Sequence, residues 1–140
     1  MHTLKSIFGL LLAGALALSG LESSAATPAE IQKSFETTTR ASTPGFSGFS
    51  AERGRQFFGT THGNDWSCAS CHTASPAATG RHANTGKEIA PLAPVANPQR
   101  FADAAKVEKW FKRNCNDVLG RTCTAQEKGD VLAYLMSIAK

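Results

Sequence analysis

The sequence lacks the features that mark a repeat protein, a nucleic-acid-binding protein or a membrane-spanning protein. No internal repeat is visible in its 140 residues. Its formal net charge is only +4, and the basic residues are not interleaved with aromatic side chains, so the composition gives no argument for nucleic acid binding. Hydrophobic and charged fractions of 41% and 19% are ordinary for a globular domain and argue against wholesale disorder. A chain of this length is expected to form one small domain.

The N-terminal segment has the pattern of a secretory signal peptide. Lys5 precedes an apolar run at residues 7–18, and small residues surround a candidate cleavage site near Ser24 and Ala26. The run is too short to span a bilayer comfortably, and no cysteine follows it that would indicate a lipid anchor. We therefore expect a signal peptide over residues 1–26 and one domain over residues 27–140. That domain would be exported to the periplasm, an oxidising compartment, without stable membrane insertion.

Helical patterns dominate the rest of the chain, and no segment has a convincing strand pattern. Four residues are suitable helix caps: Thr27, Ser50, Asp103 and Thr124. The first and last of these also have a glutamate three residues later, which completes a capping box. Residues 37–50 are rich in Thr, Ser, Gly and Pro and are expected to form a loop, while prolines favour an extended path through residues 74–98. The pattern predicts an all-α fold.

The most specific motif in the chain consists of two cysteines and a histidine. Cys68, Cys71 and His72 have the C-x-x-C-H spacing of c-type haem attachment. Two thiols three residues apart can bond the two vinyl groups of one porphyrin, and the adjacent imidazole then becomes the proximal iron ligand. We therefore expect one covalently attached haem c.

Two other uses of these cysteines are open at this point. A zinc site could recruit Cys115 and Cys123 as further ligands, although their spacing does not form a familiar zinc knuckle. A thioredoxin-like redox pair would need a preceding strand and a βαβ context, which the polar residues before Cys68 do not indicate. Export and the helical pattern favour haem over both.

Two glycines also fit a haem protein of this class. Gly54, followed by Phe57, and Gly129, followed by Tyr134, resemble the crossing terminal helices of small cytochromes c. Glycine at such a crossing lets two helix backbones approach closely. The same residues would also suit an ordinary helical core.

The second axial position of the iron would decide the function. A small electron carrier of the common type closes it with a methionine from a loop before the last helix. Met1 is removed with the signal peptide, and Met136 lies inside the last helical segment, where we expect it to pack. His62 is too close to the attachment motif to reach across the ring, whereas His82 is a candidate for a bis-histidine site.

Beyond the haem motif, the sequence resembles the sphaeroides haem protein family of oxygen-binding c-type cytochromes. The shared stretches are TGKEIAPLAP at residues 85–94, RF at 100–101, VEKW at 107–110 and RNCN at 113–116, with Gly120, Arg121 and Cys123. Cytochrome c double-prime is a related family with the same cysteine framework, but it has histidine at the position of Asn114. The resemblance implies a cytochrome c-like fold and Asn114 as the distal haem ligand.

The chemistry of an asparagine ligand is consistent with that role. A neutral amide oxygen is a hard, weak donor that ferric iron tolerates and that the softer ferrous ion binds poorly. Reduction would release Asn114 and leave the iron free for O2, CO or NO, to which the amide N–H could donate a hydrogen bond. Judged from the residues alone, Asn114 could instead be a helix C-terminal residue that tolerates an unusual backbone angle.

The two remaining cysteines are expected to form a disulfide. In an oxidising compartment, a bond between Cys115 and Cys123 would close a short loop and contribute about 2–3 kcal/mol by loop entropy. It would also fix the backbone beside Asn114. Free thiols or zinc ligands are the alternatives.

We therefore expect a monomeric haem protein, not clearly an enzyme, that accepts electrons and binds small ligands when reduced. A simple carrier with a closed sixth position, or a terminal reductase of an oxygen or nitrogen species, are the alternatives. The family resemblance implies a dihaem cytochrome c as electron donor, often together with a membrane cytochrome b. Four basic residues at helical spacing form either a docking surface for an acidic donor or a solvated helix face: Lys106, Lys109, Lys112 and Arg113.

Overall fold

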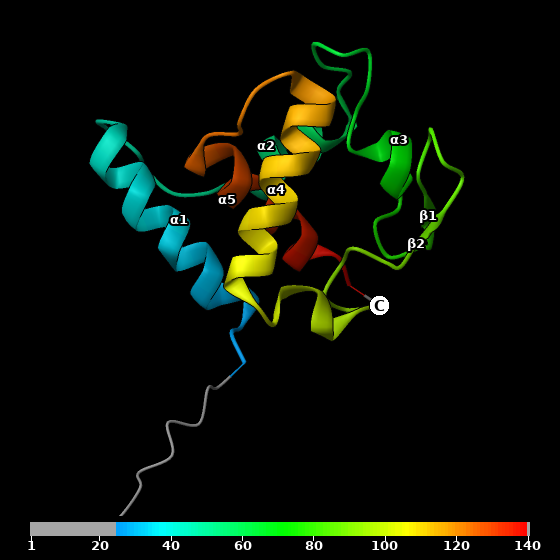
Figure 1. The fold of residues 1–140 in the computed structure, drawn as a ribbon. Coiled ribbons are helices and arrows are strands. Elements are labelled where there is room, and N and C mark those ends of the chain that lie inside the picture. Colours follow the sequence, from blue (N-terminus) through cyan, green and yellow to red (C-terminus); the bar gives the residue numbers. More distant parts are fainter. Residues whose placement is uncertain (1–24, 140) are drawn as a thin grey trace, which may run out of the picture.

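The computed structural model describes residues 25–139, so all but the last two residues of the expected signal peptide lie outside the described part. The elements follow one another as α1 (Pro28–Ser42), α2 (Ala51–Gly59), α3 (Ala69–His72), β1 (Gly80–Arg81), β2 (Glu88–Ile89), the 3-10 helix η1 (Pro98–Phe101), α4 (Ala104–Leu119) and α5 (Ala125–Ser137) (Figure 1). Within this range, no helix is both long and apolar enough to cross a membrane. The mainly helical architecture agrees with the expected fold class.

The four long helices begin where the sequence predicts. Thr27 caps α1, Ser50 caps α2, Asp103 caps α4 and Thr124 caps α5. In both capping boxes the threonine oxygen accepts a hydrogen bond from the amide three residues later. The glutamate at that position accepts one from the threonine amide, with an N–O distance of 2.8 Å in each case. These local interactions satisfy amides that would otherwise have no partner at the helix start.

The expected loop over residues 37–50 is wrong for its first part, because α1 continues to Ser42. The hydroxyls of Thr37, Thr38 and Thr39 donate to the carbonyls four residues earlier, within the helix. Thr39 is also buried at 1% exposure, so tertiary packing outweighs the weak helix propensity of threonine here. The short hairpin was missed as well. Each strand has only two paired residues, which is too short for an alternating pattern.

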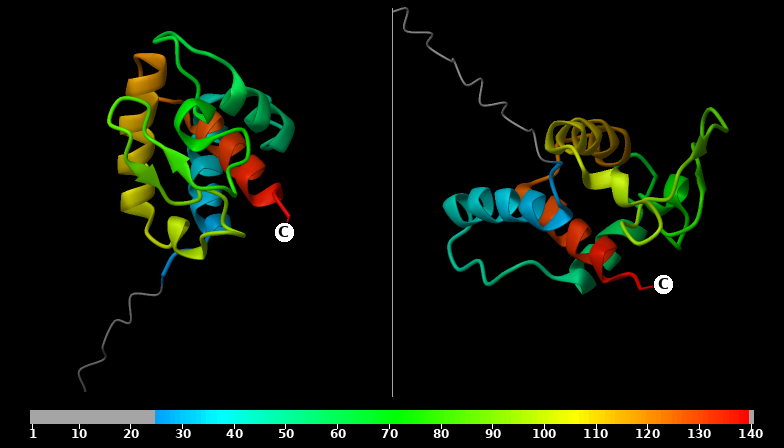
Figure 2. Two further views of the ribbon diagram at one scale, coloured as in Figure 1. Left: turned by 90° about the vertical axis from the view of Figure 1, so that its right-hand side faces the viewer. Right: turned by 90° about the horizontal axis from the view of Figure 1, so that it is seen from below.

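The core is built around α5, which packs against both α1 and α2 (Figure 2). Eight buried side chains form it: Ile31, Phe35, Phe58, Phe101, Val107, Val131, Leu132 and Leu135. The helix α5 contributes three of them, Val131, Leu132 and Leu135, and Ile138, which follows this helix, packs against the cluster partly buried. Cys68 of the haem motif also packs against this cluster, so the core supports the attachment site directly.

The crossing of α2 and α5 depends on Gly54, as predicted. A side chain at Gly54 would collide with the backbone of Asp130, so only glycine permits this approach. Gly129 has a different role from the one expected. A side chain there would collide with the ring of Phe49, which shows that this glycine makes room for an aromatic ring and not for a second helix backbone.

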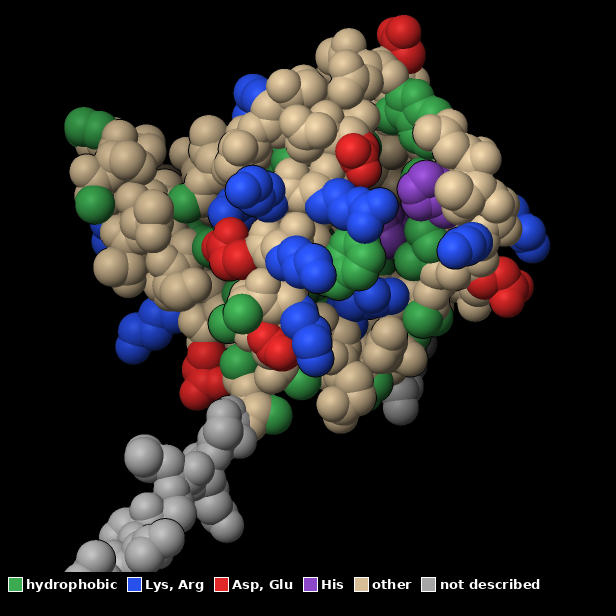
Figure 3. Space-filling model, in the orientation of Figure 1, with side chains coloured by type: hydrophobic (Ala, Val, Ile, Leu, Met, Phe, Trp, Pro, Cys, Tyr) green, Lys and Arg blue, Asp and Glu red, His purple; other side chains and the backbone are tan. Residues whose placement is uncertain are grey.

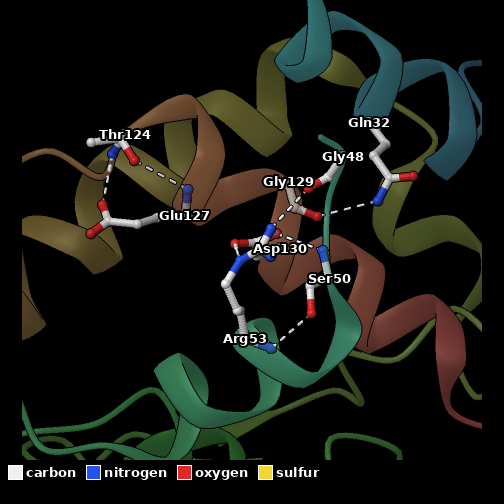
Figure 4. A network of polar contacts seen from close by, with 8 residues as sticks. All are labelled: Gln32, Gly48, Ser50, Arg53, Thr124, Glu127, Gly129 and Asp130. Atoms are coloured by element: carbon white, nitrogen blue, oxygen red, sulfur yellow. Dashed lines mark hydrogen bonds and ion pairs between the residues drawn. The ribbon is translucent and has the colours of Figure 1, made fainter. Parts of the chain in front are cut away.

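A buried carboxylate fastens the same crossing (Figure 4). Asp130, whose side chain is 7% exposed, accepts hydrogen bonds from the Ser50 amide at 2.7 Å and from two nitrogens of Arg53 at 2.8 Å. The Gln32 side chain donates to the Gly129 carbonyl at 3.2 Å. The network therefore joins α5 to both α1 and α2.

Candidate functional site

The C-x-x-C-H motif forms one short helical turn. Cys68 stands at its start with helical backbone angles, and the His72 amide donates to the Cys68 carbonyl at 3.0 Å. Ser67 and Ser70 exchange hydrogen bonds, each amide donating to the other residue's hydroxyl at 3.0 and 3.1 Å. Because residues three apart share a helix face, the turn places the Cys68 and Cys71 side chains on one side.

Both thiols of the motif are free, and they are not bonded to each other. Burial raises the pKa of the Cys68 thiol to about 11, so this group is protonated at neutral pH. A redox-active or metal-binding cysteine acts as the thiolate, which this environment disfavours. No strand precedes Cys68 within the described chain, which removes the context of the thioredoxin-like alternative.

His72 is held half-buried beside the core, with its ring centre 6.4 Å from that of Phe58. Burial, and secondly the positive charge of Arg100, lower the pKa of His72 to about 4. The imidazole is therefore neutral at pH 7, which is the form that ligates metal ions.

The β1–β2 hairpin packs closely on the attachment turn. A side chain at Gly80 would collide with the Cys71 carbonyl, and the Ala83 amide lies 3.4 Å from the Cys71 sulfur. His82 lies in this hairpin, where its Nδ1 accepts a hydrogen bond from the Thr85 amide at 3.3 Å. The structure thus places His82 on the side of the attachment cysteines and not on α4.

Two other side chains weighed as iron ligands have different surroundings. His62 stacks at 4.6 Å on Phe57, and its Nε2 lies 2.9 Å from the Phe57 carbonyl oxygen. Met136 is 36% exposed and lies outside the core cluster. Met136 therefore packs only partly and is not one of the core residues.

Asn114 lies inside α4, five residues before its last residue, Leu119. The helix-terminal interpretation is therefore wrong. The residue with the left-handed backbone is Gly120, with φ of 71°, which caps the helix. The Asn114 side chain is half-buried and takes part in none of the hydrogen bonds formed among residues 25–139. Its amide is thus available to an external partner.

The end of α4 that carries Asn114 is fixed by a disulfide. Cys115 and Cys123 are bonded, with their Cα atoms 5.6 Å apart, and both are buried. The predicted disulfide is present in the structure, and it leaves neither sulfur free to complete a zinc site. In the part of the chain that the structure covers, no group of three or more His, Cys, Asp or Glu residues is placed to hold a metal ion.

Sequence reasoning did not single out Asn64, which links the haem motif to α4. Its side-chain amide donates to the carbonyls of Asn116 at 3.2 Å and Asp117 at 3.0 Å, and its backbone amide donates to the Val118 carbonyl at 3.2 Å. The loop before α3 therefore satisfies the free carbonyls at the end of α4. The only local signal for this role is the turn-forming pair Gly63 and Asn64.

The four predicted basic residues of α4, which we call the basic ridge (Lys106, Lys109, Lys112 and Arg113), lie on one exposed face. Figure 3 shows Lys and Arg side chains gathered over α4. Lys106 pairs with Asp103 at 3.3 Å, whereas the other three cations have no carboxylate partner in the described structure. These three line a hollow together with Asn116 and Thr122. Trp110, 47% exposed, lies beside them with the Arg113 guanidinium 5.7 Å from its ring centre.

The residues around the motif are chemically suited to a covalently attached haem. Two free thiols one helical turn apart can form two thioethers, and the neutral imidazole next to them can ligate iron. The tight packing of Gly80 on Cys71 fixes the attachment turn.

Comparison with known proteins gives the family context. Residues 44–135 match a family described as a domain of unknown function, DUF1924. Cytochrome c-type protein SHP of Cereibacter sphaeroides is 54% identical over 89 residues, which cover 61% of this chain and 68% of that protein. Cytochrome c'' of Methylophilus methylotrophus is 49% identical over 83 residues, which cover 59% of this chain and 58% of that protein.

Solved structures show the same relationship. Oxidised SHP, described as an oxygen-binding cytochrome c, aligns with a TM-score of 0.68 and 46% identity over 78% of this chain and 95% of its own. Oxidised cytochrome c'' aligns with a TM-score of 0.74 and 37% identity over 81% and 95%. Its solution structure, described in relation to haem-ligand detachment, aligns with a TM-score of 0.73 and 38% identity over 81% and 94%. The predicted cytochrome c-like, all-α fold is confirmed.

Proposed function

Because the chain belongs to the family of c-type cytochromes that includes SHP and cytochrome c'', we propose that it holds one haem c through Cys68 and Cys71. His72 would ligate the iron from the same side. The observation that carries this proposal is the helical turn that presents two free thiols beside a neutral imidazole. Bound there, the haem would supply an iron that accepts an electron and takes up small ligands.

Acid–acetone extraction tests the attachment. Colour should remain with the wild-type protein, because thioether bonds survive the extraction, and should pass to the solvent or be absent in the double variant Cys68→Ala, Cys71→Ala. The matched control is Cys115→Ser with Cys123→Ser, which changes the other two cysteines and should keep its colour. A colourless wild-type protein, or one that holds zinc, would contradict the proposal.

Asn114 is the residue of this chain proposed to close the second axial position in the oxidised protein. Its half-buried amide has no other hydrogen-bonding partner among the described residues, and the Cys115–Cys123 disulfide holds the adjacent backbone. A neutral amide oxygen is a weaker donor than imidazole or thioether for the softer ferrous ion. Asn114 would therefore dissociate from the iron on reduction, while the disulfide would keep its backbone in place.

The dissociated Asn114 amide would lie next to a small ligand at the vacated axial position. Its N–H groups could donate a hydrogen bond to O2, CO or NO held at that position. SHP, which shares the fold, is described as oxygen binding. Stopped-flow mixing of the reduced protein with CO tests the open site. Rapid binding is expected, and a protein that binds no CO would instead be a simple carrier with a closed site.

We further propose that this cytochrome is a periplasmic monomer that receives its electron from an acidic protein, such as a dihaem cytochrome c. The disulfide suits an oxidising compartment. Three unpaired cations of the basic ridge line a hollow, and the exposed Trp110 lies beside Arg113, so this surface would offer both charge and apolar area to a docking partner. Opposite charges on two proteins raise their association rate, and that effect weakens as salt screens them.

A further inference from the structure

Arg100 differs from the other unpaired cations of the molecule. Of the Lys and Arg side chains in residues 25–139 that have no carboxylate partner, it is the only one that is not exposed. Its Nη2 donates to the Ala90 carbonyl at 2.6 Å, and its Nε donates to the Pro91 carbonyl at 3.4 Å. Its Nη1 takes part in no hydrogen bond within the described residues.

Neutral carbonyls do not compensate a charge that is withdrawn from water. The desolvation of a guanidinium is unfavourable unless an anion pairs with it, and burial lowers the pKa of Arg100 accordingly. Elsewhere in this structure, buried charge is paired: Asp130 binds Arg53, and the largely covered ammonium of Lys128 lies 2.6 Å from Glu108. Arg100 therefore lacks the anion that its position calls for.

The missing anion belongs on the side of the haem motif. Arg100 donates to the carbonyl of Ala90, directly after β2, and β2 pairs with β1, whose Gly80 packs on the Cys71 carbonyl. The segment that Arg100 holds is also joined to the loop after the motif, because the Leu92 and Ala93 amides both donate to the Pro76 carbonyl, at 2.8 and 2.9 Å. The 3-10 helix η1 thus positions the guanidinium beside the attachment site.

We propose that Arg100 binds a propionate carboxylate of the haem, an inference that rests on the proposed function. Haem carries two such carboxylates, and each needs a cation or hydrogen-bond donors where it leaves water. The free N–H groups on Nη1 and Nη2 form the planar fork that binds a carboxylate through two parallel hydrogen bonds. Arg100 would then bind the propionate edge of the haem, whereas the thioethers hold its vinyl-derived substituents.

The test compares three variants of the haem-loaded protein. Arg100→Gln removes the charge, Arg100→Lys keeps the charge but loses the fork, and Arg81→Gln removes an exposed arginine that donates only to the Gly86 carbonyl. Resonance Raman spectroscopy records the propionate bending bands, and a redox titration records the reduction potential. Acid–acetone extraction of each variant shows whether the haem is covalently attached.

A shift of the propionate bands in both Arg100 variants, with a lower potential in Arg100→Gln alone, is the expected result. The potential falls because an uncompensated carboxylate favours ferric iron. Arg81→Gln should match wild type in both measurements. Unchanged bands in Arg100→Gln would overturn the assignment even if the potential moved, because the charge would then act without a bond. If Arg100→Gln does not fold, unchanged bands in Arg100→Lys overturn it. Loss of haem from wild type on extraction would instead refute the proposed function itself.

Discussion

Replacing Asp130 with alanine should measurably weaken the fold at the crossing of α2 and α5. The carboxylate is 7% exposed and is the shared acceptor for the Ser50 amide and the Arg53 guanidinium. Its loss leaves the amide at the start of α2 without a charged acceptor and frees Arg53 to solvent. The haem motif should be affected only indirectly, because the Asp130 carboxylate accepts its hydrogen bonds from Ser50 and Arg53, which lie outside the motif.

The magnitude follows from the two kinds of contact. A hydrogen bond to a charged acceptor contributes about 1.5–3 kcal/mol. The ion pair with Arg53, whose side chain is 46% exposed, adds only about 0.2–1 kcal/mol because solvent screens it. Alanine regains about 0.5 kcal/mol through its higher helix propensity. Asp130→Ala should therefore lower the free energy of unfolding by about 1.2–3.5 kcal/mol.

Urea unfolding at neutral pH, followed by far-ultraviolet circular dichroism, measures this quantity. Arg53→Gln removes the ion pair and an exposed hydrogen bond to the Gly48 carbonyl but keeps the bond from the Ser50 amide to Asp130, so it should have a smaller effect than Asp130→Ala. The matched control is Arg55→Gln, two residues further along α2, whose partner Glu52 is equally exposed, and it should leave the unfolding curve unchanged. If Asp130→Ala were as stable as wild type, or if Arg53→Gln and Arg55→Gln lost equal stability, the Asp130 carboxylate would not stabilise the crossing as proposed.

Three further predictions concern the disulfide, the basic ridge and acid stability. Replacing both Cys115 and Cys123 with serine should lower the free energy of unfolding by about 2.5 kcal/mol through loop entropy; two alkylatable thiols in the unreduced wild-type protein would show that the bond is absent. Reduction by an acidic donor should slow as the salt concentration rises. Lys109→Gln should slow this reaction more than Lys33→Gln, which changes an exposed lysine of α1. Rates independent of ionic strength would exclude electrostatic steering. The hydrogen bond from Arg121 lowers the pKa of Glu127 from its usual 4.5, so this pair stabilises the fold above that pH and stops doing so as the pH falls through the lower folded value. Glu127→Gln should therefore reduce stability at neutral pH but not in acid, and an equal loss at both pH values would disprove the linkage.

Features set by local interactions were predictable from the sequence. The helix caps and the C-x-x-C-H turn depend on residues within three or four positions of one another, and the structure contains all of them. The extension of α1 to Ser42 was not predictable in this way, since it depends on burying Thr39 against the rest of the fold. Gly54 was predicted from its resemblance to a helix crossing of small cytochromes c, although its contact with Asp130 is long-range, whereas the ring that Gly129 accommodates comes from a distant loop and was not predicted.

The residues of the candidate site also differ in how far the sequence alone predicts them. The candidate attachment residues are predicted from their spacing alone, whereas Asn114 is predicted from a family resemblance. Gly120, six residues later, is the local signal that could have placed Asn114 inside the helix, because glycine commonly follows the end of a helix. In the sequence, Arg100 stands out only as part of the RF pair shared with the related family. Its significance comes from burial without a partner, a property of the folded chain that no local pattern encodes.

Optical and EPR spectra of both oxidation states, recorded with and without CO, test most directly whether Asn114 controls the iron. We expect the ferric wild-type protein to be largely high-spin, because an amide is a weak ligand, and the ferrous protein to bind CO rapidly. Asn114→His should shift the protein toward a low-spin form that binds CO more slowly, because imidazole is the stronger donor in both states. A wild-type protein that is low-spin in both states, or an Asn114→Ala variant with an unchanged ferric spectrum, would show that Asn114 is not the ligand.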